Sequence, residues 1–162
     1  MFALNEKVVY PGYGVAIISC VVDKVVGGSV TKFFELKFHS KDMTILVPME
    51  NSRAAGLRRI SSSEKVQEVL HVLSEPVGID CEMLSVNWNK RNKEYHCKLR
   101  SGDLYEICKI YRDLKYISSK KELSFGEKNL LHKTEALLAE EISIVNHQGE
   151  EKTIEHLRAR FS

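Results

Sequence analysis

The sequence predicts an α+β protein in which a small β-rich module precedes a larger helical one, and three observations lead to that prediction. The first 50 residues contain short runs of β-branched and aromatic residues separated by turn residues. Near residue 60, the apolar residues change to the three-to-four spacing of amphipathic helices. The 162 residues are 43% hydrophobic and 28% charged, which is typical of chains that fold into one ordinary domain or two small ones.

Four or five short strands in the first 50 residues indicate a small, strongly bent sheet or barrel. Four of them are expected at Lys7–Tyr10, Val15–Val22, Thr31–Phe38 and Met43–Val47. The turn Pro11–Gly14 closes the first strand, and Val25–Ser29 offers a hairpin turn at its two adjacent glycines. Pro48 ends the last strand, because proline cannot donate to a central ladder.

The first two helices are expected after a boundary near residues 52–62. Ser61 and Glu64 have the spacing of a capping box, and the short helix that they begin is expected to stop at Pro76. A loop over residues 77–86 follows. Asn87 is a favourable N-cap for the next helix, which is expected to continue to about Arg100 and to stop at Gly102.

Three further helices complete the expected helical module. The first is indicated by the amphipathic positions Leu104, Ile107, Cys108, Tyr111 and Leu114. Ser124 and Glu127 form a second capping box before the longest helical pattern, which extends to Ile142. A short final helix is marked by Ile154, Leu157 and Phe161.

Catalytic and metal-binding motifs are not found in the sequence, so we expect no enzyme and no cofactor. It has no phosphate-binding P-loop and no nucleophile elbow, and its histidines and cysteines lack the paired spacing of a zinc site. The four cysteines are widely spaced, as in proteins of a reducing compartment, and the start of the chain does not resemble a secretory signal. We therefore expect a cytoplasmic protein. The alternative is a thiol enzyme that uses Cys97 or Cys108.

Positive charge is concentrated in one internal segment, although the net charge of the chain is only +2. Residues 85–121 carry 10 basic and 4 acidic side chains, and the segments on both sides of them are acidic. The only tryptophan, Trp88, lies in this segment beside Lys90, Arg91 and Lys93. Cations at the first turn of a helix suit phosphate groups, and an apolar ring there can pack against bases. A lone tryptophan is also a common core anchor, so both interpretations stay open.

Several short segments occur in a defined order through nearly the whole chain. They are Val8–Pro11 with Gly14, Asp42–Pro48 with Glu50–Asn51, Gly56–Arg58, Asn87–Trp88 with Lys90–Arg91, Ser101–Asp103, Tyr111–Leu114 and Leu123–Lys128. Each segment alone is weak, but their order and spacing together resemble the CarD/CdnL family of bacterial RNA-polymerase-binding transcription regulators. The resemblance implies a Tudor-like, strongly bent antiparallel β domain over residues 1–58 and a helical DNA-binding domain over residues 62–162.

In this family the β domain docks on the polymerase β subunit. The resemblance assigns the second and fourth strands to that contact, with Lys24 and Val26 on one and Thr44 and Leu46 on the other. Lys24 and Leu46 match positions where relatives often carry arginine. Leu46 departs from that pattern, so a charged contact cannot be carried over to it. Edge-strand pairing between the two sheets would provide a docking mode.

The family's helical domain contacts promoter DNA near the upstream edge of the transcription bubble. Trp88 matches a tryptophan wedged at the minor groove, Lys90 and Arg91 match cations on phosphates, and Asn87 and Lys93 flank them. The resemblance therefore implies a monomeric regulator, associated with the nucleoid through polymerase, that stabilises the open complex with little sequence readout. The alternative is a protein-interaction module that docks on polymerase or another partner and has no direct role at DNA.

Overall fold

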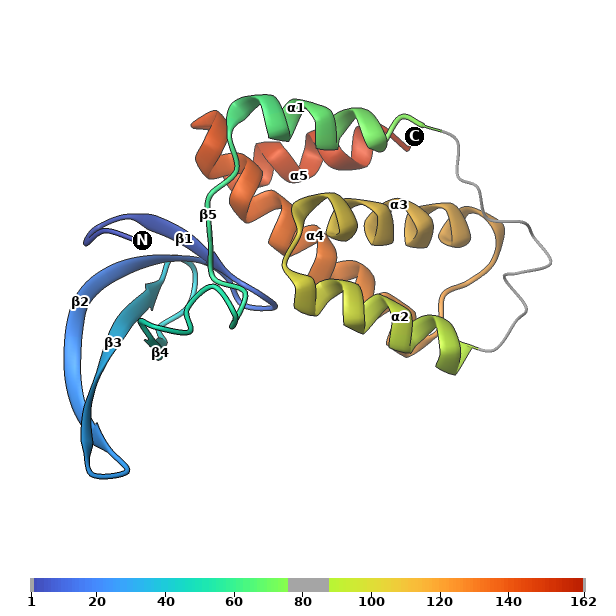
Figure 1. Ribbon diagram of the computed structural model, residues 1–162. Coiled ribbons are helices and arrows are strands. Elements are labelled where there is room, and N and C mark those ends of the chain that lie inside the picture. Colours follow the sequence, from blue (N-terminus) through green and yellow to red (C-terminus); the bar gives the residue numbers. More distant parts are fainter. Residues whose placement is uncertain (1, 76–87, 162) are drawn as a thin grey trace. The chain divides into compact units, whose positions relative to one another are not determined.

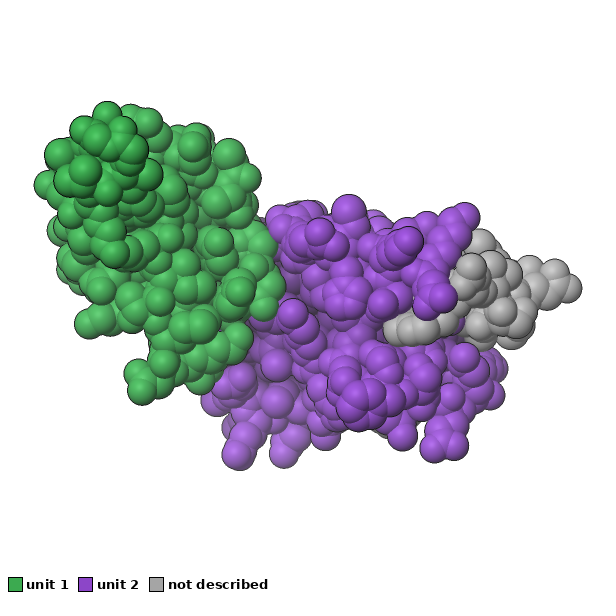
Figure 2. Space-filling model, turned by 90° about the horizontal axis from the view of Figure 1, so that it is seen from below, with its two compact units in different colours: residues 1–60 green, residues 61–162 purple. Residues whose placement is uncertain are grey.

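The computed structural model describes residues 2–75 and 88–161 and confirms the expected α+β class. An antiparallel five-stranded sheet comes first, and five helices follow it in the described part of the chain. The molecule divides into two compact units, residues 1–60 and residues 61–162 (Figure 2). Each unit has a hydrophobic core of its own.

The first unit is a sheet in which the strand order is β4-β3-β2-β1-β5. Its strands are β1 (Lys7–Tyr10), β2 (Gly14–Val26), β3 (Ser29–Phe38), β4 (Thr44–Pro48) and β5 (Arg58–Arg59). β2 and β3 form a long, curved hairpin (Figure 1), and the register between them shifts at Ile18/Cys20. Because side chains alternate along a strand, Phe34, Leu36 and Phe38 of β3 all turn to the core, where they are buried.

The β2–β3 turn is tighter than expected from the sequence. Only Gly27 and Gly28 form the turn, with φ angles of 59° and 82°, and Val25 and Val26 belong to β2. A two-residue turn with positive φ at both positions matches the twist of a hairpin, so the flanking valines pair as strand residues. The short strand β5, which was not expected, forms by pairing with Val8 and Val9 of β1.

The second unit contains the five helices. They are α1 (Ser63–Val72), α2 (Trp88–Ser101), α3 (Leu104–Lys120), α4 (Phe125–Asn146) and α5 (Glu150–Ala159). α3 lies in the core, and its buried residues include every apolar position from which the helix was predicted, Leu104, Ile107, Cys108, Tyr111 and Leu114. α2 ends at Ser101, and Gly102 follows with a φ of 72°, as expected for a glycine that stops a helix.

One of the two predicted capping boxes is confirmed and the other is wrong. Ser124 accepts from the backbone N–H of Glu127, and the Glu127 carboxylate accepts from the backbone N–H of Ser124. Ser61 does not cap α1, because the hydroxyl of Ser62 accepts from the backbone N–H of Lys65 instead. The Ser61 N–H donates to the buried carboxylate of Glu141 on α4 at 2.9 Å.

A buried carboxylate joins the three C-terminal helices. Glu135 of α4 accepts from the Tyr111 hydroxyl of α3 at 2.8 Å and from Arg158 of α5 at 2.7 and 3.2 Å. Burial by itself raises the pKa of Glu135, but the hydrogen bonds from Arg158 and Tyr111 hold that pKa below its usual value. The carboxylate is therefore charged at neutral pH and holds α5 against α3 and α4.

Candidate polymerase and DNA interfaces

The outer edge of β4 presents unpaired backbone groups where the sequence predicts a protein contact. In an antiparallel pair, alternate residues bond to the neighbouring strand. Phe38 donates to the carbonyl of Met43, and Met49 donates to the carbonyl of Lys32. The backbone N–H and C=O groups of the odd-numbered residues from 43 to 49 therefore point toward β3. The N–H and C=O groups of Thr44 and Leu46 consequently point away from β3. No other described strand pairs with that edge.

The four residues predicted to bind polymerase lie on one face of the sheet. Leu46 is opposite Glu35 and Thr44 is opposite Lys37, whereas Lys24 is opposite Thr31 and Val26 is opposite Ser29. All of these β3 partners have odd numbers and therefore share the face opposite the core residues of β3.

The same four residues do not form one compact cluster. β4 ends at Pro48, which pairs with Phe33, and Lys24 pairs with Thr31 beyond that point. Lys24 and Val26 are both exposed near the tip of the hairpin. Thr44 and Leu46 therefore offer backbone groups at an edge, whereas Lys24 and Val26 offer only side chains.

Those predicted DNA-binding residues that the structure describes lie at the N-terminal end of α2. The helix begins at Trp88; Asn87 and the side chain of Trp88 lie outside the described residues. Lys90 and Lys93 are both exposed in the first two turns, and no acidic residue lies in the first turn. The positive, N-terminal end of the helix dipole and the ammonium groups of Lys90 and Lys93 together suit an anionic partner.

Arg91 differs from the two neighbouring lysines, because it faces the interior. Its side chain is only 15% exposed, and its Nη2 lies 3.9 Å from Oε2 of Glu127, the buried carboxylate of the α4 capping box. Lys121 lies 3.7 Å from the other oxygen of that carboxylate. Arg91 therefore ties α2 to the start of α4. Its spacing in the sequence gives no sign of this contact.

Several other cations of the basic segment lie beside acidic or carbonyl groups of the protein itself. Lys98 and Lys109 each lie 3.8 Å from the Glu106 carboxylate. Arg112 is 13% exposed, and it donates to the carbonyl of Val72 at the end of α1. The basic surface available to a large anion is therefore narrower than the charge of residues 85–121 indicates.

Phe125 is an exposed aromatic residue that the sequence analysis did not single out. It is the first residue of α4 and is 80% exposed, the most of any large apolar side chain in the described residues. Glu127, two residues further along α4, lies 3.9 Å from Arg91 of α2. The sequence does indicate that Phe125 is exposed, because it follows the N-cap Ser124 and is not part of the apolar stripe that starts at Leu130.

Comparison with known proteins identifies the family. The family model described as "CarD, C-terminal domain" matches residues 68–158, more than half of the chain. The chain belongs to the CarD family. The model "CarD-like/TRCF RID domain" matches residues 2–61, and the two matched regions fall almost entirely within the two compact units. The resemblance to this family predicted from the sequence is thereby confirmed.

One relative extends the comparison over most of the chain. The Bacillus subtilis (strain 168) protein named "Putative transcription factor YdeB" is 22% identical to this CarD-family chain over 145 residues. The aligned region covers 90% of this chain and 92% of the relative. The similarity therefore includes both units.

Two cysteines of this CarD-family chain, Cys20 and Cys108, have raised pKa values and are therefore weak nucleophiles. Cys108 is buried and donates to the carbonyl of Val69, and burial raises its pKa to about 12. The hydrogen bond to the Glu35 carboxylate raises the pKa of Cys20. Cys97 is exposed on α2. Within residues 2–75 and 88–161, no three metal-ligating side chains gather, and no helix there is long and apolar enough to cross a membrane.

Proposed function

We propose that this CarD-family transcription regulator binds the RNA polymerase β subunit through residues 1–60 and promoter DNA through residues 61–162. In this proposal the DNA contact lies near the upstream edge of the transcription bubble and stabilises the open complex. The observation that carries the polymerase contact is the open edge of β4, in which Thr44 and Leu46 direct their backbone groups outward. The family membership supports interaction with polymerase.

Docking by strand addition is favoured by the edge of β4. A strand of the partner beside β4 would bond to the backbone of Thr44 and Leu46, and main-chain bonds of this kind provide affinity without a charged side chain. This removes the difficulty raised by Leu46, which stands where relatives often carry arginine. The apolar side chain lies next to the proposed strand and is half-buried before any partner binds.

Contact with DNA is supported by the exposed lysines of α2. Lys90 and Lys93 can neutralise phosphates, whereas Arg91 is only 15% exposed, lies 3.9 Å from Glu127 and would serve chiefly to fix the start of α2. Trp88 begins the helix that carries these cations. We propose that its ring packs at the edge of the bubble, where it would hinder reannealing of an unstacked base step. Phosphate and wedge contacts carry little base information, so weak sequence preference is expected.

The two contacts are proposed to act by tethering. A regulator held on polymerase presents α2 to the promoter at a high effective concentration, so the DNA contact can be weak when measured alone. No catalytic step is needed for this action, because the stabilisation of one state of the promoter suffices.

The strand-addition step can be tested with a pair of substitutions at Leu46. Leu46→Pro removes an N–H group that faces the open edge and leaves the bonds of β4 to β3 in place, because proline is tolerated at such edge positions. Leu46→Ala removes the side chain and keeps the N–H. We expect Leu46→Pro to weaken capture of β-subunit fragments far more than Leu46→Ala does, with the circular dichroism spectrum unchanged. Equal capture by both variants would refute strand addition.

The DNA contact can be tested separately by its dependence on salt. Replacement of both Lys90 and Lys93 by glutamine should lower the slope of log affinity against log salt by about 1.8 in the polymerase–promoter complex, at roughly 0.9 per phosphate contact. Lys152→Gln, which removes an exposed cation of α5, is the matched control. If the slope does not change, and no crosslinks form between DNA and α2, the chain is instead a protein-interaction module without a DNA role.

A further inference from the structure

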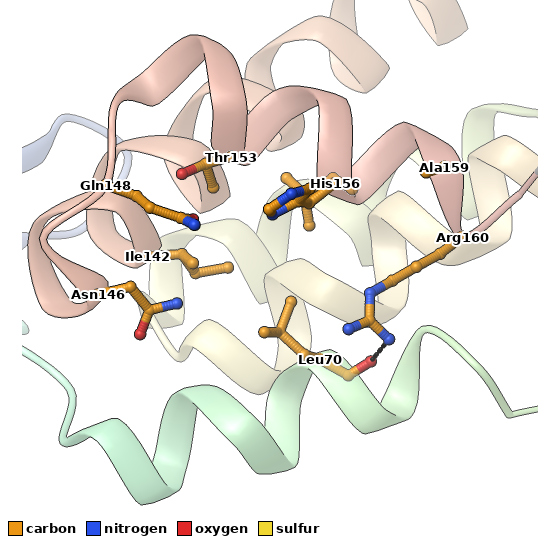
Figure 3. A pocket seen from close by; sticks show the side chains of 9 residues that line it. Leu70, Ile142, Asn146, Gln148, Thr153, His156, Ala159 and Arg160 are labelled. Atoms are coloured by element: carbon orange, nitrogen blue, oxygen red, sulfur yellow. Dashed lines mark hydrogen bonds between the residues drawn. The ribbon is translucent and has the colours of Figure 1, made fainter.

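A hollow of about 300 Å³ lies in the helical unit among α1, the end of α4 and α5 (Figure 3). Its lining residues are Leu70, Ile142, Asn146, Gln148, Thr153, His156, Leu157, Ala159 and Arg160. No residue proposed to meet polymerase or DNA is among them. The volume is at the lower end of the range of small-molecule sites, roughly 300–1,000 Å³.

The base of the hollow is apolar. Ile142 of α4 and Leu157 of α5 are almost fully buried, at 2% and 1% exposure. The half-buried Leu70 of α1 lies beside Ile142 (Figure 3). Three helices supply these side chains, so the base is formed by the helical core itself. It can accept the apolar or aromatic body of a ligand.

The rim is polar, and three of its side chains reach solvent without a hydrogen-bond partner in the described part of the protein. Asn146 follows the apolar stripe of α4, Gln148 lies in the turn before α5, and His156 is on α5. Gln148 and His156 extend toward each other above Ile142 (Figure 3). Within residues 2–75 and 88–161, the side chains of Asn146, Gln148 and His156 make no hydrogen bond and no ion pair. Two carboxamides and an imidazole therefore offer both donors and acceptors to a ligand.

The charge of the lining favours an anion. Arg160 is the only lining residue with a permanent charge, and no carboxylate contributes to the hollow. Its Nη1 donates to the carbonyl of Leu70 and to the hydroxyl of Ser74, each at 3.1 Å. These two bonds hold the guanidinium at the rim and leave its other N–H groups available, a geometry that suits a carboxylate or phosphate.

We propose that this hollow is an effector site for a small acid that joins an aromatic or heterocyclic ring to a carboxylate or phosphate. The ring would lie on Ile142 and Leu157, the carboxamides and His156 would bond to its polar atoms, and Arg160 would hold the anionic group. A ligand there would touch α1, α4 and α5 together and would therefore stabilise the helical unit against unfolding.

The test uses the full chain without polymerase or DNA, so its result is independent of the proposed transcriptional role. Two acids are titrated by calorimetry, indole-3-acetate as an aromatic carboxylate and adenosine 5′-monophosphate as a heterocyclic phosphate. Indole and adenosine are their uncharged counterparts. At least one acid should bind with millimolar or better affinity, and its counterpart should bind about tenfold more weakly, a factor equal to about 1.4 kcal/mol.

The lining residues without internal partners supply the decisive variants. Gln148→Ala and His156→Ala should each weaken binding of that acid severalfold and leave the melting temperature of the free protein unchanged. His132→Ala, at an exposed position of α4 outside the hollow, is the matched control and should bind as the wild type does. Binding of neither acid, equal binding of acid and counterpart, or binding that survives Gln148→Ala and His156→Ala would each overturn the proposal.

Discussion

Removal of the Arg158 guanidinium should destabilise the helical unit in a manner that depends on pH. Arg158→Gln deletes two charge-assisted hydrogen bonds to Glu135, each of which contributes about 1.5–3 kcal/mol in buried settings. The Arg158 side chain is 56% exposed, so solvent screening reduces that contribution, whereas the Glu135 side chain is only 8% exposed and keeps the bond from Tyr111. We therefore expect a loss of about 2 kcal/mol in the free energy of unfolding at pH 7.

The direction of the pH effect follows from the lowered pKa of Glu135. A carboxyl whose pKa is lower in the folded state contributes stability above its unfolded pKa of about 4.3, and that contribution is lost as the pH falls through the folded value. The difference between wild type and Arg158→Gln should accordingly be smaller at pH 3 than at pH 7.

Urea denaturation followed by circular dichroism at 222 nm measures this difference, because all five described helices lie in residues 61–162. Lys152→Gln removes a cation from the exposed side of the same helix and should cost less than about 0.5 kcal/mol. The reasoning fails if Arg158→Gln destabilises the protein equally at pH 7 and pH 3, or no more than Lys152→Gln.

Three further predictions concern other parts of the two units. In the folded protein at pH 8, iodoacetamide should label Cys97 and spare Cys108, as read by peptide mass mapping; equal labelling would contradict the raised pKa and burial of Cys108. Ser124→Ala removes the confirmed N-cap of α4 and should lower the free energy of unfolding by about 1 kcal/mol in urea titrations, whereas no loss would show that the cap contributes nothing. Gly56→Ala places a Cβ at 2.6 Å from Cγ of Pro11, at a φ of +92°, and should lower the melting temperature of the β unit; an unchanged temperature would contradict this strain.

The order and type of the elements could be predicted because they depend on local patterns. The stripe of α3 and the capping box at Ser124 are signals within a few residues, and both are present in the structure. The elements that differed depend on contacts between distant residues. Arg58 and Arg59 have no strand signal of their own and become β5 only because they pair with β1.

Distant contacts also explain what the sequence did not reveal about the cap of α1 and the candidate interfaces. Ser61 donates to Glu141, 80 residues away, so the next serine becomes the N-cap of α1. Arg91 faces Glu127 of another helix, which no spacing along α2 indicates. The open edge of β4 at Leu46 likewise depends on the strand order, and a single sequence does not specify that order.

Trp88→Ala in the polymerase–promoter open complex tests the central proposal most directly. The lifetime of the complex, measured after addition of a competitor for free polymerase, should fall about tenfold or more relative to wild type, because the loss of a wedge worth about 1.4 kcal/mol corresponds to a factor of ten. Trp88→Phe, which keeps an aromatic ring, should retain part of the effect. Both variants should keep the helical content of the wild type and bind the β subunit equally. A lifetime that Trp88→Ala leaves unchanged, with β-subunit binding intact, would contradict the proposed wedge.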